Sequence, residues 1–203
     1  NLHVTYWTNG NHILHRAYSY NALTNVLAPI GNFVQVDTAG SSNHPSVAVS
    51  PFDNSLTVAW VSQADNPPKI RARVRASNGT WSGVQSVSTA SVWTSTENGI
   101  NIDQGPSLII DSGGTKHLTY IQSFDGSVGD YGRIHYVTYT GLGWFDQSLN
   151  AFTHDPVLAI NNVGGIYIIG HGHPKNPTCL SMLDMCTIMK SSNGTWGTPQ
   201  LFA

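Results

Sequence analysis

Short apolar segments alternate with polar turns along the whole chain, and one apolar phrase occurs three times. It reads HPSVAV from His44, GPSLII from Gly105 and DPVLAI from Asp155. After each copy come a turn, an apolar strand, a polar loop, another strand and a turn that contains Gly and Trp. The copies begin 61 and 50 residues apart, and strand-rich repeats of roughly 40–50 residues are typical of β-propellers. The pattern therefore predicts an all-β chain of repeated antiparallel sheets.

The copy that begins near residue 43 shows the plan of one repeat most clearly. In this copy the segment Ile70–Arg75 alternates apolar and polar residues, which indicates a strand with one buried face. Turn-forming residues separate the segments at 51–54 and 78–81. The repeat is expected to hold four antiparallel strands, which is one propeller blade; they lie near 47–49, 56–61, 70–75 and 84–87.

The same plan can be laid over the rest of the sequence. It predicts strands near 108–110, 116–121, 134–139 and 144–149, and near 157–160, 165–169, 186–190 and 196–202. Residues 2–7, 13–19 and 33–36 match the second, third and fourth strands of a blade, with no innermost strand before them. The expected units are a blade fragment at 1–40, a blade at 43–88, a loop insertion at 89–103, and blades at 104–150 and 153–203.

The chain thus holds about three and three-quarter blades of a β-propeller, a partial ring. A repeat cannot bury both of its faces alone, and propellers usually have at least four blades. We therefore expect a second chain or segment to supply the remaining blades.

Composition narrows the classes of function. Charged residues make up 10% of the chain and the net charge is −2, so nucleic acid is not expected as a partner. There is no apolar run of about 20 residues, so no membrane span is expected. Arg71, Arg73 and Arg75 form the one cationic cluster, which we expect on an exposed strand face. Few Lys and Glu with many Asn, Ser, Thr and Gly suit a secreted protein.

Two further features fit an extracellular setting. Cys179 and Cys186 are the two cysteines, and their spacing fits a disulfide-closed loop, with two unpaired thiols as the alternative. Asn78 and Asn193 begin Asn-Gly-Thr glycosylation sequons in equivalent turns, where Asn-Gly also serves as a turn pair. No metal site and no cofactor are expected.

The segments SNGTW at Ser77 and Ser192 resemble the Asp-box of sialidase-like (BNR) β-propellers, Ser-x-Asp-x-Gly-x-Thr-Trp. The Asp is absent here and the spacing is compressed; GLGW at Gly141 departs further. In that family the motif closes a turn between outer strands, away from the active site. The resemblance implies the propeller fold, and no catalytic sialidase residue maps onto this sequence.

Loops that enter first strands and loops that join second to third strands lie on one face of a propeller. We call it the loop-bearing face, because the long insertions fall there, and function usually occupies such a face. Aromatic rings, amides and carboxylates suit sugar recognition. The candidate ligand-binding residues on this face are His44, Trp93, Glu97, Asp125, Asp130, Tyr131, His154, Asp155, His171 and His173.

Three functions remain open at this stage. The favoured one is a secreted, lectin-like propeller that binds carbohydrate through the loop-bearing face. The second is a polysaccharide-degrading hydrolase or lyase whose site is completed by the missing blades. A hydrolase would need two carboxyl groups, such as Glu97 with Asp103, Asp125 or Asp155. The third is a structural or interaction scaffold. Whether the chain is an enzyme is left open, with binding preferred.

Overall fold

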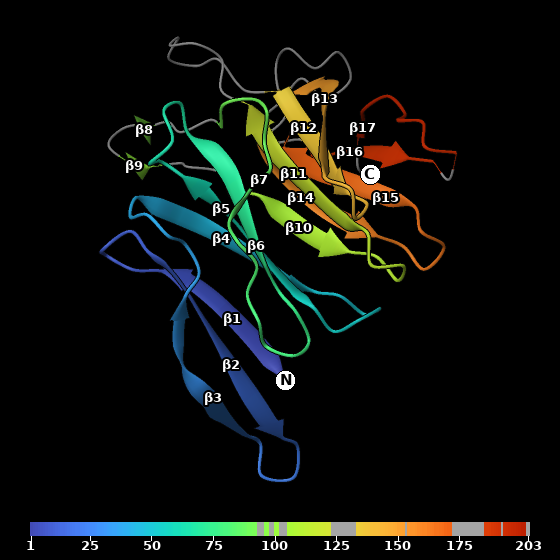
Figure 1. Ribbon diagram of the computed structural model, residues 1–203. Coiled ribbons are helices and arrows are strands. Elements are labelled where there is room, and N and C mark those ends of the chain that lie inside the picture. Colours follow the sequence, from blue (N-terminus) through green and yellow to red (C-terminus); the bar gives the residue numbers. More distant parts are fainter. Residues whose placement is uncertain are drawn as a thin grey trace.

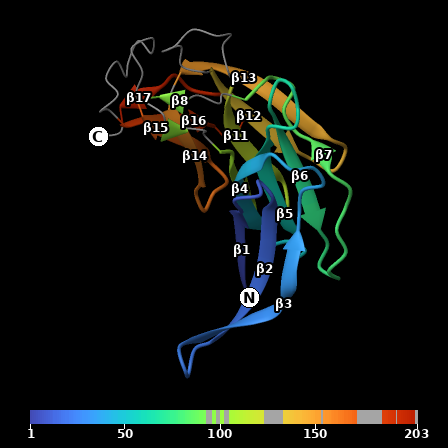
Figure 2. The ribbon, with the colours of Figure 1, turned by 90° about the vertical axis from the view of Figure 1, so that its left-hand side faces the viewer.

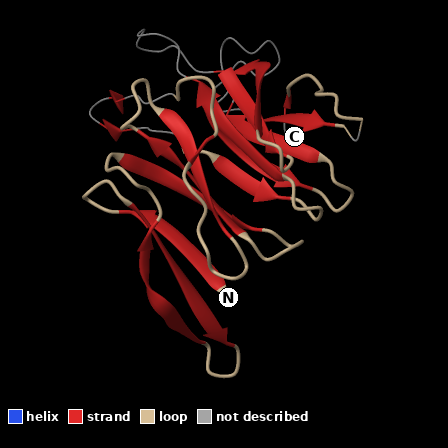
Figure 3. Ribbon diagram, viewed as in Figure 1, coloured by secondary structure: helices blue, strands red, loops and turns tan. Residues whose placement is uncertain are grey.

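The computed structural model describes residues 1–92, 96–97, 100–101, 105–122, 133–152, 154–171, 185–191 and 193–201. Every regular element in these ranges is a β-strand, as Figure 3 shows. Fifteen strands form four antiparallel sheets, one with three strands and three with four. Two short strands, β8 (Thr96–Glu97) and β9 (Ile100–Asn101), pair with each other separately.

The four sheets follow one another along the chain. The first sheet holds β1 (Leu2–Trp7), β2 (Ile13–Asn21) and β3 (Val26–Gln35). The second holds β4 (Ser42–Val49), β5 (Leu56–Ser62), β6 (Lys69–Arg75) and β7 (Gln85–Ser86). The third holds β10 (Ser107–Ile110), β11 (Lys116–Gln122), β12 (Arg133–Tyr139) and β13 (Trp144–Phe152), and the fourth β14 (His154–Ile160), β15 (Ile166–His171), β16 (Met185–Lys190) and β17 (Gln200–Leu201).

The sheets stand side by side in an arc (Figures 1 and 2). Strand β4 contacts β1 on one side and β10 on the other, and β10 also contacts β14. Within each four-stranded sheet the strands are paired in chain order, so β4, β10 and β14 each form one edge of their sheet. The three copies of the repeated phrase therefore lie next to one another along the inner side of the arc.

Two pairs of hydrogen bonds show how the first sheet corresponds to the second. The amide of Val36 donates to the Ile13 carbonyl (2.8 Å), as the amide of Val87 donates to the Ile70 carbonyl (3.0 Å). The Ile13 amide donates to Asp37 Oδ1 (2.8 Å), as the Ile70 amide donates to Ser88 Oγ (2.9 Å). Strands β1, β2 and β3 thus match β5, β6 and β7, the second to fourth strands of a repeat.

A serine in the repeated phrase joins neighbouring sheets. Ser46 Oγ accepts a hydrogen bond from the Leu108 amide (3.2 Å), and Ser107 Oγ accepts one from the Leu158 amide (3.0 Å). In both cases the phrase of one sheet holds the backbone of the next phrase. The repeated sequence therefore aligns the inner strands of neighbouring sheets.

Apolar side chains fill the three seams between the sheets. Ile13, Val58 and Trp60 lie in the seam between the first and second sheets, and each is at most 1% exposed. The second seam centres on Ile70 and Leu118, and the third on residues such as Ile134 and Ile168. Each such side chain contributes about 1.5–3 kcal/mol when fully buried, so the arc is held mainly by packing between sheets.

Most predicted strands are confirmed within two residues of their ends. The main error concerns the first sheet, where a fourth strand was expected only at 33–36 but β3 spans Val26–Gln35. All of its residues are exposed, so no pattern of burial marks it in the sequence. The last predicted strand, 196–202, is also shorter: β17 is Gln200–Leu201, with an isolated bridge at Trp196.

The expectation for the arginine cluster is wrong. Arg71, Arg73 and Arg75 are half-buried. Arg73 Nη1 donates to the Val36 carbonyl of the first sheet (3.1 Å), and its guanidinium lies 5.4 Å from the centroid of the Trp81 ring. The face of β6 that carries the arginines therefore packs into the first seam, because the neighbouring sheet covers it.

Candidate functional site

The phrase starts at His44 and Asp155 share an unusual backbone conformation. Both residues have φ of 47°, in the left-handed region that non-glycine residues seldom adopt. In both sheets the pairing with the second strand shifts register at this point. Such bulges redirect a side chain at the end of a strand and often occur at functional sites.

The phrase start of the third sheet lies directly against His44. A Cβ atom placed on Gly105 would be 2.7 Å from His44 Cβ and 2.9 Å from its carbonyl oxygen. This approach is possible because glycine has no side chain. The beginnings of β4 and β10 therefore meet at the inner side of the arc. They lie on the face of the molecule where the second strand of each sheet ends.

An exposed tryptophan stands beside this meeting point. The ring of Trp7, at the end of β1, lies 4.8 Å from the ring of His44, with 33° between the ring planes. Trp7 is 49% exposed, whereas Val61 and Ile121, at the matching ends of β5 and β11, are at most 1% exposed. We refer to Trp7 and His44 as the axial cluster; Trp7 was not among the sequence candidates.

Other predicted residues lie on the same face with less detail. His171 ends β15, is exposed, and pairs through the backbone with His154 at the start of β14. Glu97 belongs to β8; the structure gives no side-chain detail for Glu97 or His154. Five candidates lie outside the described residues: Trp93, Asp125, Asp130, Tyr131 and His173.

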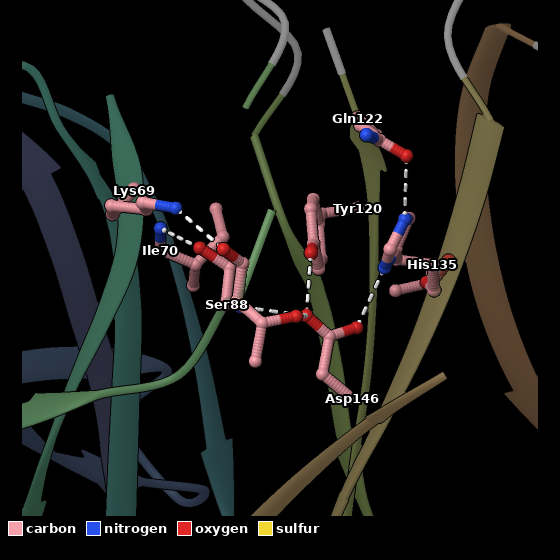
Figure 4. A network of polar contacts seen from close by, with 9 residues as sticks. Lys69, Ile70, Ser88, Tyr120, Gln122, His135 and Asp146 are labelled. Atoms are coloured by element: carbon pink, nitrogen blue, oxygen red, sulfur yellow. Dashed lines mark hydrogen bonds and ion pairs between the residues drawn. The ribbon is translucent and has the colours of Figure 1, made fainter. Parts of the chain in front are cut away.

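A buried polar network underlies the loop-bearing face of the third sheet (Figure 4). His135 Nδ1 lies 2.7 Å from Asp146 Oδ1, and its Nε2 lies 2.9 Å from Gln122 Oε1. Asp146 Oδ2 accepts hydrogen bonds from the Tyr120 hydroxyl and from both the amide and the hydroxyl of Thr89, each 2.7 Å long. Thr89 belongs to the segment after the second sheet, so the network joins two sheets.

The electrostatics of this network favour an ionised carboxylate. Burial alone would raise the pKa of Asp146, but hydrogen bonds from His135, Tyr120 and Thr89 outweigh it and lower the pKa to about 2. Burial, together with the hydrogen bond to Asp146, raises the pKa of Tyr120. The Asp146 side chain is fully buried and that of His135 is 7% exposed. The network therefore stabilises the second seam and offers no open reactive group.

The remaining sequence predictions have mixed outcomes. Asn78 and Asn193 are exposed, and each side-chain oxygen accepts a hydrogen bond from the amide of the threonine two residues later (3.0 Å). These contacts fit the role of Asn-Gly as a turn pair. Glycosylation there stays a prediction. Cys186 is buried at 4% exposure, but Cys179 lies outside the described residues, so their disulfide also stays a prediction.

In the described ranges, no group of three or more His, Cys, Asp or Glu side chains is arranged to hold a metal ion. No helix long and apolar enough to cross a membrane occurs in the part of the chain that the structure covers.

Comparison with known proteins decides the architecture. No family model matches the sequence, and no curated protein does. Among solved structures, the chain is similar to a glycoside hydrolase family 43 arabinoxylan arabinofuranohydrolase from Bacillus subtilis in complex with cellotetraose, with a TM-score of 0.52 and 15% identity. That match covers 98% of this chain and 52% of the other. The fold is a β-propeller.

This β-propeller chain spans about half the length of that enzyme. A thermostable family-43 glycoside hydrolase matches less well, with a TM-score of 0.47, 13% identity, and coverage of 98% of this chain and 73% of the other. The propeller class predicted from the repeat is confirmed. The comparisons support that class rather than the sialidase-like superfamily suggested by the SNGTW turns.

Proposed function

We propose that this chain is a secreted carbohydrate-binding β-propeller that recognises glycans through its loop-bearing face. The observation that carries the proposal is the axial cluster, where the half-exposed indole of Trp7 stands beside His44. A flat aromatic surface next to polar groups is what a pyranose ring needs, because it has apolar C–H faces and a rim of hydroxyls. Asp155, exposed at the matching phrase start, adds an acceptor for hydroxyl groups.

The likeness to the glycoside hydrolase family 43 arabinoxylan arabinofuranohydrolase supplies independent support. That protein is described as being in complex with cellotetraose, so a protein that contains this architecture binds an oligosaccharide. At 15% identity this likeness concerns the fold, and the proposed ligand class rests on the axial cluster.

A glycan array probed with the intact protein tests the proposal. We expect binding to a defined set of neutral oligosaccharides, and Trp7→Ala should weaken it about five- to tenfold, since an aromatic contact contributes about 1 kcal/mol or more. Phe52→Ala is the matched control, because Phe52 is a 72% exposed aromatic residue in the turn between β4 and β5. No binding to any glycan, or equal losses in both variants, would leave the scaffold alternative.

A second candidate is a polysaccharide-degrading enzyme. It is favoured by the likeness to glycoside hydrolases and by the carboxylate of Asp155 at an inner-strand start. Such enzymes use two carboxyl groups about 5–9.5 Å apart, so Asp155 would need a partner such as Glu97. Release of reducing sugars from arabinoxylan, abolished by Asp155→Asn and by Glu97→Gln, would favour this candidate over a binding module.

The two ends of the arc support the proposal that another chain or segment supplies further sheets. Leu2, on the first sheet, is 47% exposed, although Leu56 at the matching position of the second sheet is 1% exposed. Met185 and Met189 on the last sheet are 42% and 45% exposed. Native mass spectrometry would test this: a stable lone species of 21.9 kDa would contradict it.

A further inference from the structure

A groove of about 320 Å³ opens along the seam between the first and second sheets. Its walls come from the segment that joins the two sheets, from the end of β5, and from the start of β6 with the loop before it. Among the lining side chains, those of Asp65 and Arg71 are partly exposed, whereas Asp37, Ser42 and Ser62 are buried. Arg71, a member of the half-buried arginine cluster, thus lines an open space.

Arg71 is held in a fixed position by Asp65. Its Nε donates to Asp65 Oδ2 (2.8 Å) and its Nη2 donates to Asp65 Oδ1. The two side chains are 28% and 24% exposed, so each remains partly accessible. A paired guanidinium in a partly buried position is already oriented before a ligand arrives, which reduces the entropy lost on binding.

The charges of the groove select the class of ligand. Two carboxylates and one guanidinium line the groove: Asp65 pairs with Arg71, whereas the buried Asp37 accepts the Ile13 amide and lies 3.1 Å from His12 Nδ1. A phosphate, a sulfate or another anion is therefore disfavoured. The partly exposed Asp65 carboxylate accepts hydrogen bonds and the Arg71 guanidinium donates them. Together they match the hydroxyl groups of a neutral sugar, which both donate and accept.

The groove and the axial cluster lie close together on one face. Ser42 lines the groove, and His44 follows two residues later on β4, a separation of at most about 7 Å in an extended strand. The Ser42 amide donates to the carbonyl of Asn11 (2.7 Å) in the turn that follows Trp7. Both sites therefore border the same seam.

We propose that this groove is a distal subsite for the saccharide bound at the axial cluster, and that it takes a neutral sugar residue further along the same chain. The inference rests on the proposed carbohydrate-binding function. It adds that affinity depends on oligosaccharide length, because only a chain that reaches from Trp7 to Arg71 occupies both places.

Titration calorimetry with xylo-oligosaccharides and cello-oligosaccharides of two to six units tests the inference on the intact protein. For the series that binds, the longer members should bind more tightly, and Arg71→Gln should weaken them at least about tenfold, the usual effect of losing a hydrogen bond from a charged group. The shortest members should be unaffected. Trp7→Ala should weaken short and long members alike.

Arg16→Gln is the matched control, since the Arg16 guanidinium of β2 packs over the Phe33 ring (4.5 Å) and does not line the groove. Equal affinity for short and long members, or equal effects of Arg71→Gln and Arg16→Gln, would overturn the distal subsite while leaving the axial site standing. If the wild-type protein bound neither series and no glycan on the array, the proposed function and this inference would both fail.

Discussion

A pair of histidines in the first seam, of which His15 is buried and His3 half-buried, makes stability depend on pH. His3 Nδ1 and His15 Nε2 are 3.0 Å apart, and their rings stack with centroids 5.3 Å apart. His15 is 4% exposed and meets the edge of the Trp81 ring at 5.6 Å. Burial, then the charges of His3 and Arg75, lower the pKa of His15 from 6.5 to about 4. The folded protein therefore prefers neutral His15.

The magnitude follows from this shift in pKa. The unfolded chain takes up a proton at His15 as the pH falls below about 6.5, whereas the folded chain does so only near pH 4. Stability is therefore fully present above pH 6.5 and is lost as the pH falls towards 4. At about 1.4 kcal/mol for each unit of pKa, the loss is about 3 kcal/mol.

Urea unfolding monitored by tryptophan fluorescence between about pH 4 and pH 8 measures this loss. His15→Phe keeps a ring against Trp81 but removes the titration, so we expect the free energy of unfolding to vary about 3 kcal/mol less over that range. His3→Gln should remove only part of the pH dependence, because burial is the larger cause. Comparison of the variants at pH 8, where His15 is neutral in both states, isolates the effect of packing. An unchanged pH dependence in His15→Phe would refute the reasoning.

Two further substitutions test the contacts between sheets. Gly105→Ala would place a Cβ 2.7 Å from that of His44 and should destabilise the protein by about 1–3 kcal/mol. Gly83→Ala is its control in thermal unfolding, because nothing lies within 4 Å of the added atom. Equal effects of the two substitutions would contradict the close approach. Asp146→Ala would leave the buried donors around it without an acceptor and should lower the free energy of unfolding in urea by about 3–5 kcal/mol. Asp146→Asn keeps one carbonyl oxygen and should lower it less. Similar small losses for both variants would show that the network adds little stability.

The repeat explains why much of the fold could be predicted. The three phrases supplied the inner strands, and the matched turns placed the strands that follow them. Alternation in Ile70–Arg75 predicted one buried face, and Ile70 and Ala72 are fully buried. Where a strand has no buried face the signal fails, as in β3, whose residues are all exposed.

The site could be predicted only in part, because its key contacts join residues from different sheets. His44 was recognised from its place at a phrase start, but its stacking with Trp7 depends on how the first sheet packs against the second. The pairing of His135 with Asp146 likewise depends on register between β12 and β13, which a single sequence does not specify. Arg71 appeared as one of three similar arginines, and nothing in the alternation distinguishes the one that lines a groove.

The serine contacts between phrases give the arc a direction. Ser46 of the second sheet accepts an amide of the third, and Ser107 of the third sheet accepts an amide of the fourth. The corresponding place in the third phrase is occupied by Val157. The three repeats are consequently not interchangeable: if the gene segments were shuffled so that the DPVLAI repeat came second, its successor would lose a side-chain acceptor for an inner-strand amide. The order of the repeats is thus part of how the inner strands are aligned.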